Sequence, residues 1–62
     1  MDAVVEAPWR DARRSRMLGA AARVFARSSF EHASMDEIAA EAGVGKPTLY
    51  RYFSSKDALF VA

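Results

Sequence analysis

The chain contains no cysteine among its 62 residues. Disulfide bonds and cysteine-ligated metal sites are therefore excluded, and the composition fits a reducing cytoplasm. No apolar run approaches the roughly 20 residues that a membrane-spanning helix needs. The opening stretch also lacks the basic start and the long apolar core of a signal peptide. We therefore expect a cytoplasmic protein without a membrane partner.

The chain also has little of what an enzyme requires. His32 is the only histidine, and a single histidine without a second ligand is more often solvated than a metal ligand or base, so we assign it no function. No paired-carboxylate site and no glycine-rich phosphate loop accompany it. A chain of this length buries only about 60% of its unfolded surface, too little to enclose a substrate pocket. We predict one small domain that is not an enzyme and that has no cofactor and no metal site.

The formal net charge of +1 conceals segments of opposite sign. Residues 10–27 hold six arginines and one aspartate, residues 31–41 hold four acids and no Lys or Arg, and residues 46–56 hold three bases and no acid. If the first and third segments face the same way, the domain has a basic face suited to phosphates. Residues 10–15 are then either an arm that follows phosphates or the minor groove, or a solvated helix end.

A short helix is predicted to start at Met35. Ser34 and Glu37 fit a capping box, in which the serine oxygen accepts the Glu37 amide proton and the glutamate returns to the serine amide. Gly43 ends the helix, because glycine enters the left-handed region at little cost. Its apolar stripe recurs at helical spacing. The residues of the stripe are Met35, Ile38, Ala39 and Ala42.

A second short helix follows directly and runs to about Tyr52. Val44 fills the turn, and Pro47 lies near the first helical position, where its missing amide proton is no loss. Leu49 and Phe53 share the inner face of this helix. Two short helices joined by such a turn are the sequence form of a helix-turn-helix.

Two flanking helices complete the expected fold. The first spans Asp11 to Arg27, and the last begins at Lys56 behind the N-cap Ser55. The first helix ends in the segment Ser28–Phe30, where Phe30 packs as core. The expected inward residues are Met17, Leu18, Ala21, Val24 and Phe25 of the first helix and Leu59 and Phe60 of the last.

The order of these residues resembles the DNA-binding domain of the TetR family of bacterial transcriptional regulators. The most specific part is the run Leu-Tyr-x-Tyr-Phe-x-x-Lys. The resemblance extends from about Arg14 to the end of the chain. The matching residues are Ile38-Ala39, Ala42-Gly43-Val44, Pro47-Thr48-Leu49-Tyr50, Tyr52-Phe53, Ser55-Lys56 and Leu59-Phe60. Two positions depart from the family pattern: Ser29 stands where glycine is usual, and Gly45 where serine is frequent.

The resemblance implies an all-α fold, a small three-helix helix-turn-helix (homeodomain-like) domain plus the start of a fourth helix. Residues 1–13 are then a flexible basic N-terminal arm, and residues 14–62 are the TetR-type domain with its motif at about 34–53. The C-terminal domain that binds an effector and dimerises in longer family members is absent. The chain is therefore interpreted either as a fragment of a longer regulator, which we favour, or as a truncated product.

The resemblance also implies which residues contact DNA. Phosphate contacts are expected from Ser34, Tyr50, Tyr52 and Lys56, which position the protein without reading sequence. Base-edge contacts are expected from Lys46, Pro47, Thr48 and Arg51.

The implied function is sequence-specific binding of a double-stranded DNA operator, as part of a nucleoid-associated repressor. Helix Lys46–Tyr52 would enter the major groove. A homodimer is expected only for a full-length form, and the small-molecule effector site is not in this chain. Alone, the chain is expected to bind DNA weakly, at about 10⁻⁴ to 10⁻⁶ M. The alternative is a truncated helical protein-interaction peptide without autonomous DNA binding, pairing through Leu59, Phe60 and Val61.

Overall fold

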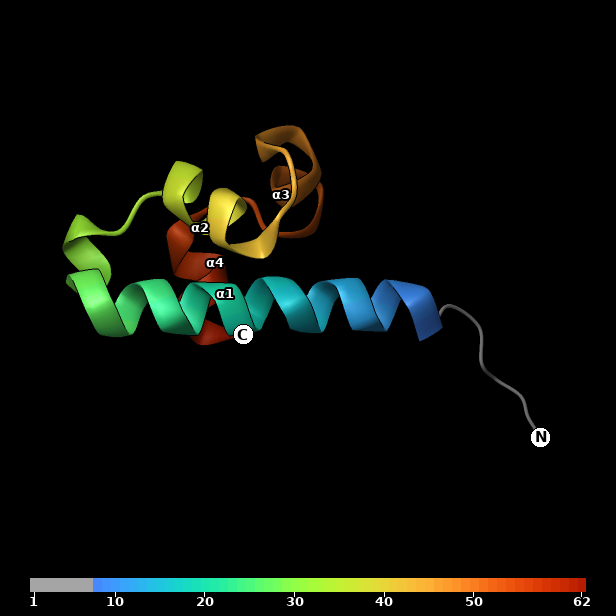
Figure 1. The fold of residues 1–62 in the computed structure, drawn as a ribbon, viewed down its shortest axis with the longest axis horizontal. Helices are drawn as coiled ribbons and strands as arrows, with labels where there is room; N and C mark the ends of the chain where they lie inside the picture. The colour runs from blue at the N-terminus through green and yellow to red at the C-terminus, as the bar shows by residue number, and fades with distance from the viewer. Residues whose placement is uncertain (1–7) are drawn as a thin grey trace.

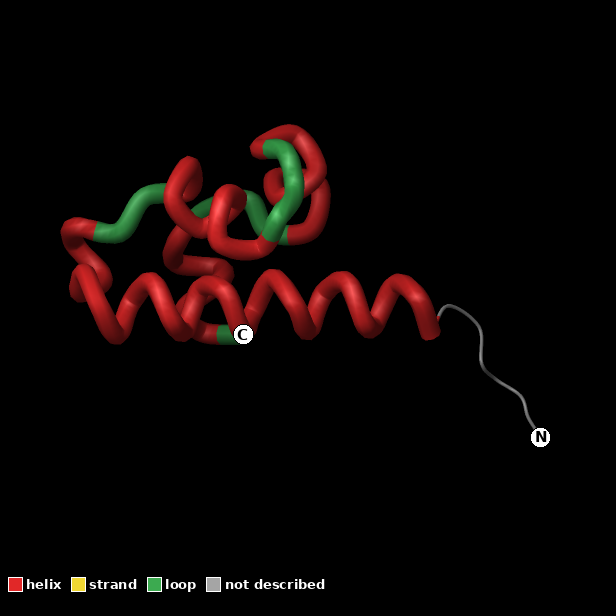
Figure 2. Tube along the Cα trace, viewed as in Figure 1, coloured by secondary structure: helices red, strands yellow, loops and turns green. Residues whose placement is uncertain are grey.

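The computed structural model describes the backbone of residues 8–62 and the side chains from residue 12 onward. Within this range the protein is all-α, as predicted, and no strand occurs (Figures 1 and 2). The four helices are α1 (Pro8–His32), α2 (Met35–Ala42), α3 (Lys46–Tyr52) and α4 (Lys56–Val61). None of them has both the length and the apolarity needed to cross a membrane.

Helix α1 is the platform on which the other helices pack. In Figure 1 it runs along one side of the molecule, with α2 and α3 above it and α4 crossing behind it. It begins at Pro8, before the predicted start at Asp11. Residues 8–13, assigned from sequence to a flexible arm, are thus helical, while residues 1–7 of that arm lie outside the described residues.

The C-terminal end of α1 is kinked at Ser29. This residue has φ 70° and ψ 161°, a region of backbone space that is populated almost only by glycine. Its hydroxyl lies 3.4 Å from the backbone amide nitrogen of His32, and its carbonyl accepts the Ala33 amide proton at 3.1 Å. Ser29 therefore ends the regular part of α1 and starts one more turn. The kink falls at one of the two positions where the chain departs from the family pattern.

Replacing Ser29 with glycine should stabilise the domain by about 1 kcal/mol. The strain at such a residue costs about 1–3 kcal/mol, whereas a serine-to-glycine change at a capping position loses only a few tenths. The midpoint of thermal unfolding should rise by roughly 4–8 °C for a domain of this size. The neighbouring Ser28→Gly change is the matched control. Ser28 has ordinary helical geometry and donates to the Glu37 carboxylate at 3.3 Å, so this change should lower the midpoint.

The helix-turn-helix forms where the sequence predicts it. Ser34 Oγ accepts the Glu37 amide proton at 3.0 Å, and Gly43 adopts the left-handed conformation with φ 74° and ψ 30°. The second half of the expected capping box is different. Among the described hydrogen bonds, the Glu37 carboxylate accepts one from Ser28 Oγ of α1 rather than from the Ser34 amide. This carboxylate therefore joins α2 to α1 instead of closing its own helix end.

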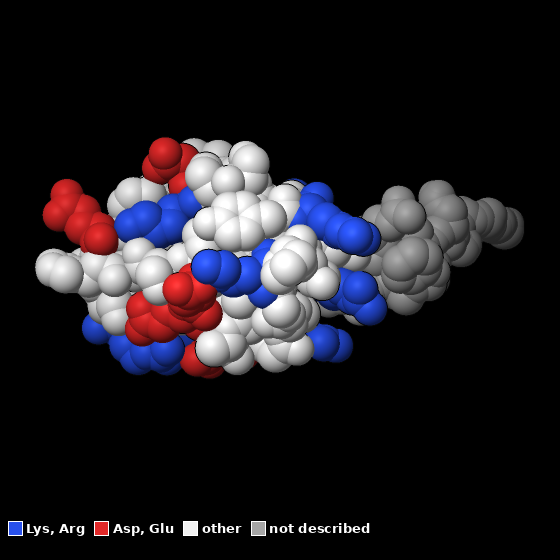
Figure 3. Space-filling view, turned by 90° about the horizontal axis from the view of Figure 1, so that it is seen from above, with Lys and Arg blue, Asp and Glu red and all other residues white. Residues whose placement is uncertain are grey.

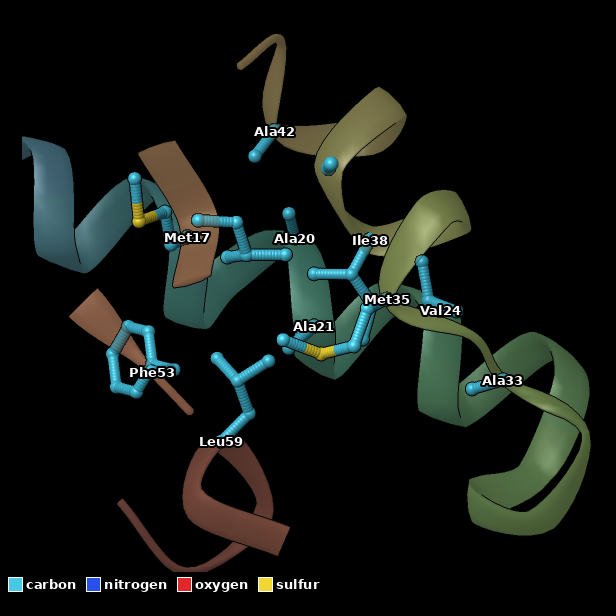
Figure 4. Packing of buried hydrophobic residues seen from close by; sticks show 12 residues of the cluster. Met17, Ala20, Ala21, Val24, Ala33, Met35, Ile38, Ala42, Phe53 and Leu59 are labelled. Carbon is cyan, nitrogen blue, oxygen red and sulfur yellow. The ribbon is translucent and has the colours of Figure 1, made fainter. Parts of the chain in front are cut away.

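The core lies between α1 and the motif. Figure 4 shows side chains from α1 and α2 meeting at its centre, with Phe53 and Leu59 at one side. Helix α3 adds Leu49, which is fully buried. Five of the twelve core residues are alanines, which let the helices approach closely. The core residues are Met17, Ala20, Ala21, Val24, Ala33, Met35, Ile38, Ala39, Ala42, Leu49, Phe53 and Leu59.

Helix α4 differs from the prediction at one residue. Ser55 caps the helix by accepting the Ala58 amide proton at 3.2 Å, and Leu59 is buried, as expected. Phe60, expected to face inward, is 63% exposed. Its ring lies edge-on to those of Phe25 and Phe30, with centroids 5.8 and 5.2 Å away, so it covers the outer edge of the core. Phe30 is likewise only half-buried, not a core residue as expected.

Candidate nucleic-acid interface

Helix α3 presents one buried and one exposed face. Leu49 is fully buried, which turns its neighbours on the helix toward solvent. Tyr50 is 46% exposed, and Arg51 and Pro47 are exposed beside it. These three predicted contact residues are therefore brought together on one outward surface. The surface is held in place by the buried leucine behind it.

Two further predicted residues lie partly within the fold. Thr48 is half-buried, and Tyr52 is half-buried and packs against the core. Tyr52 thus combines an apolar ring surface with a phenol that can donate a hydrogen bond. Ser34 is exposed at the start of α2, where its Oγ already accepts the Glu37 amide proton. Its hydroxyl proton remains able to donate to an anion.

Lys46 is placed at the first position of α3 and is paired with an acid. Its Nζ lies 2.9 Å from Asp36 Oδ1 on the first turn of α2. This hydrogen bond and the carboxylate charge raise the pKa of Lys46 above its usual value. The lysine predicted to reach a base edge is therefore held by a neighbouring helix in the free protein.

Lys56 lies in a different environment from the other candidates. Its Nζ donates to the carbonyl oxygens of Phe30 at 2.7 Å and Glu31 at 3.3 Å, and lies 4.6 Å from the centre of the Phe30 ring. Carbonyls at the C-terminal end of a helix are the natural partners of a cation. The ammonium therefore joins the start of α4 to the end of α1.

The N-terminal half of α1 adds basic charge near α3. Arg13, Arg14 and Arg16 are all exposed. The Arg14 guanidinium lies 5.3 Å from the centre of the Phe53 ring, directly after the last residue of α3. In Figure 3 the charged side chains visible toward the end of the molecule where α1 begins are all basic. The first and third charge segments thus meet where α1 passes the end of α3.

The C-terminal half of α1 uses its arginines within the fold. Arg23 Nε lies 2.9 Å from Glu41 Oε2, and an Arg27 terminal nitrogen lies 3.2 Å from Glu41 Oε1. Hydrogen bonds from Arg23 and Arg27 lower the pKa of Glu41. Glu41 is therefore paired with these two arginines on one flank of the domain. Asp36, in the same acidic segment, pairs instead with Lys46 of α3.

The family described as bacterial regulatory proteins, tetR family, matches residues 17–62, which contain most of α1 and all of α2, α3 and α4. The chain belongs to the TetR family. The matched region includes the exposed face of α3 and the helices that hold it. The TetR resemblance and the helix-turn-helix predicted from the sequence are thereby confirmed.

Related TetR-family proteins come from several bacteria. The chain is 53% identical over 53 residues to the transcriptional activator FasR of Mycolicibacterium smegmatis, and the match covers 86% of the chain and 24% of FasR. A TetR-like regulator from Rhodococcus sp. RHA1 superposes with a TM-score of 0.77 at 51% identity, over 79% of this chain and 27% of that protein. A mutant of HlyIIR superposes with a TM-score of 0.78 at 33% identity, over 82% and 29%. The chain thus spans about a quarter of the length of these relatives.

The matched family is one of regulatory proteins, which is not an enzyme class. An open hollow between α1 and α4 is lined only by residues without titratable side chains. No cluster of three or more metal-ligating side chains occurs among the residues that the structure describes. The residues that line the hollow are Leu18, Ala21, Ala22, Phe25, Leu59, Phe60 and Ala62.

Two residues near the candidate interface were missed from the sequence. The sequence places Asp36 only in the acidic segment 31–41 and Arg14 only in the basic segment 10–27. The first could not have been found from spacing, because Asp36 lies seven positions before Gly43 and meets Lys46 only through the angle between α2 and α3. The second depends on how α1 crosses α3, which local spacing does not reveal.

Proposed function

We propose that the chain is the DNA-binding domain of a transcriptional regulator and that α3 enters the major groove of a double-stranded operator. The observation that carries this proposal is the outward surface of Pro47, Tyr50 and Arg51, adjoined by the basic half of α1. A helix can enter the major groove, and its side chains can there reach base edges. Membership of the TetR family supports the same role.

The residues of this surface divide by the chemistry of their side chains. Tyr50, Tyr52 and Ser34 supply hydroxyl groups that donate to phosphate oxygens and position the helix. Arg51 has the planar donor fork that matches O6 and N7 of guanine, and Thr48 has a methyl group suited to thymine. The remaining two candidates, Lys46 and Pro47, lie at the head of the helix.

Lys56 takes another part in this proposal. Two of the three N–H donors of its ammonium are directed at carbonyls at the end of α1, which are strong partners for a cation. We therefore assign it to holding α4 against α1 while DNA is bound. A Lys56→Ala change would alter folding as well as binding, so it is a poor probe of phosphate contacts.

Specific recognition is proposed to need a second copy of the domain. One α3 reaches a single half-site, whereas two-fold dimers bind two half-sites about one helical turn or a multiple apart. The parts that dimerise and bind a small effector belong, in this proposal, to the longer protein. The direction of control does not follow from α3. A repressor was expected, yet the relative at 53% identity is named an activator.

Fluorescence anisotropy with labelled duplex DNA across a salt series tests the proposal. Binding by the 62-residue chain should be weak, with a dissociation constant of about 10⁻⁴ to 10⁻⁶ M, and should weaken linearly on a log–log salt plot. The Tyr50→Phe and Tyr52→Phe variants keep the rings and lose one hydroxyl each. Each should bind about two- to tenfold more weakly at an unchanged salt slope, because a neutral hydrogen bond releases no counterion.

A helical chain that shows no salt-dependent binding would contradict the proposal. Circular dichroism therefore accompanies each titration. Nanomolar, sequence-selective binding by the isolated monomer would contradict the requirement for a second copy, while leaving the role of α3 intact.

A further inference from the structure

An acidic side chain lies at the edge of the proposed DNA-binding surface. Asp36 occupies the second position of α2, and its Oδ1 is 2.9 Å from Nζ of Lys46. The two side chains are 71% and 52% exposed, so this pair lies at the surface and not in the core. An exposed acid on a surface that binds phosphates lowers affinity for any duplex. Its presence there calls for a role.

The position of Lys46 places the pair on the outward face of α3. Lys46 precedes Tyr50 by one helical turn, and residues four apart lie on the same side of a helix. The Tyr50 side chain also contributes to raising the pKa of Lys46, which agrees with their proximity. Asp36 therefore holds a lysine that lies on the same side of the helix as a proposed phosphate contact.

We propose that Asp36 is a specificity-determining residue, which restrains Lys46 and so weakens binding to DNA that lacks the operator. This inference rests on the proposed function. A free lysine binds any phosphate and steepens the salt dependence by about 0.9 per contact. A lysine paired with a carboxylate binds a phosphate less tightly. The ion pair must first be broken, and the carboxylate that is left then repels the phosphates. Lys46 is released only where a base edge offers acceptors in the right place, such as O6 and N7 of guanine.

The test uses Asp36→Asn on a duplex of arbitrary sequence, with anisotropy measured across a salt series. Freeing Lys46 should tighten binding about two- to fivefold, the range set by the strength of exposed ion pairs. It should also steepen the log–log salt slope by about 0.9. The matched control is Asp57→Asn. Asp57 is an exposed aspartate at the same position of α4, so this variant makes the same change in net charge.

Lys46→Gln then shows whether the effect passes through the lysine. In the Lys46→Gln background, Asp36→Asn should change affinity and slope no more than Asp57→Asn does. Lys46→Gln alone should alter the slope by less than about 0.5, because a restrained lysine makes no phosphate contact with such DNA. This variant leaves the N-terminal turn of α2 intact, so it remains informative if Asp36→Asn is less stable by circular dichroism.

Three results would overturn the inference while leaving the proposed function in place. The first is that Asp36→Asn and Asp57→Asn change DNA affinity and salt slope equally. The second is that Asp36→Asn has its full effect on affinity in the Lys46→Gln background. The third is that Lys46→Gln alone changes the salt slope by about 0.9. In each of them the unmodified chain still binds duplex DNA. Failure of the unmodified chain to bind at any salt concentration would overturn the proposed function, and the inference with it.

Discussion

The Leu49→Ala change should remove a large part of the free energy that holds the chain folded. Leu49 is fully buried, and truncating such a leucine costs about 2–5 kcal/mol. A domain of this size has a free energy of unfolding of only roughly 3–9 kcal/mol. The large side chains that share complete burial with it are Met17, Val24 and Ile38, so little else compensates for the loss. The second helix of the motif would lose its only buried residue, and the exposed face opposite would lose its support.

Urea or thermal unfolding followed by circular dichroism measures this loss. Val61→Ala is the control, since Val61 is 80% exposed and its truncation should change the free energy of unfolding by less than about 0.5 kcal/mol. If Leu49→Ala unfolded at nearly the same denaturant concentration as the unmodified chain, the packing of α3 described above would be wrong.

The parts of the fold that the sequence predicts well depend on near neighbours. Ser34, Gly43 and Ser55 each bond to residues three or four positions away, so short patterns contain the whole interaction. Leu49 and Phe53 are predicted correctly for a similar reason, because residues four apart share a helix face.

Predictions fail where distant segments decide the outcome. Leu59 and Phe60 are both apolar, and both were expected to face inward. Only one side of the short helix α4 packs against the core, and Leu59 lies on that side. Phe60 is left at the rim with two other aromatic rings. The departure from the family pattern at Ser29 locates the kink but does not give its φ and ψ values.

In the candidate site, too, local features are predicted from the sequence and contacts between distant segments are not. The family motif leads to the outward residues of α3, and Tyr50 and Arg51 are exposed there. The partners of the two lysines could not be read from spacing. Lys56 bonds to a carbonyl 26 residues earlier, and Lys46 to an acid across the turn. Such contacts depend on the angles between helices, and they change what each lysine is free to bind.

Arg51→Glu should reduce affinity for duplex DNA on the order of a hundredfold. Arg51 is exposed in the last turn of α3. Charge-assisted hydrogen bonds are worth about 1.5–3 kcal/mol, and the glutamate adds repulsion from the phosphates to the loss of that contact. Anisotropy at low salt, where the unmodified chain binds best, gives the widest range for this measurement.

Arg51→Lys separates charge from base recognition at the same position. Lysine keeps the positive charge but lacks the planar fork that pairs with a guanine edge. On duplex of arbitrary sequence it should bind within about twofold of the unmodified chain, with the same salt slope. On an operator it should lose about 1–3 kcal/mol of discrimination at the guanine that Arg51 reads. Equal binding by the glutamate and lysine variants would mean that Arg51 faces away from DNA, and that the outward face of α3 is not the surface that enters the groove.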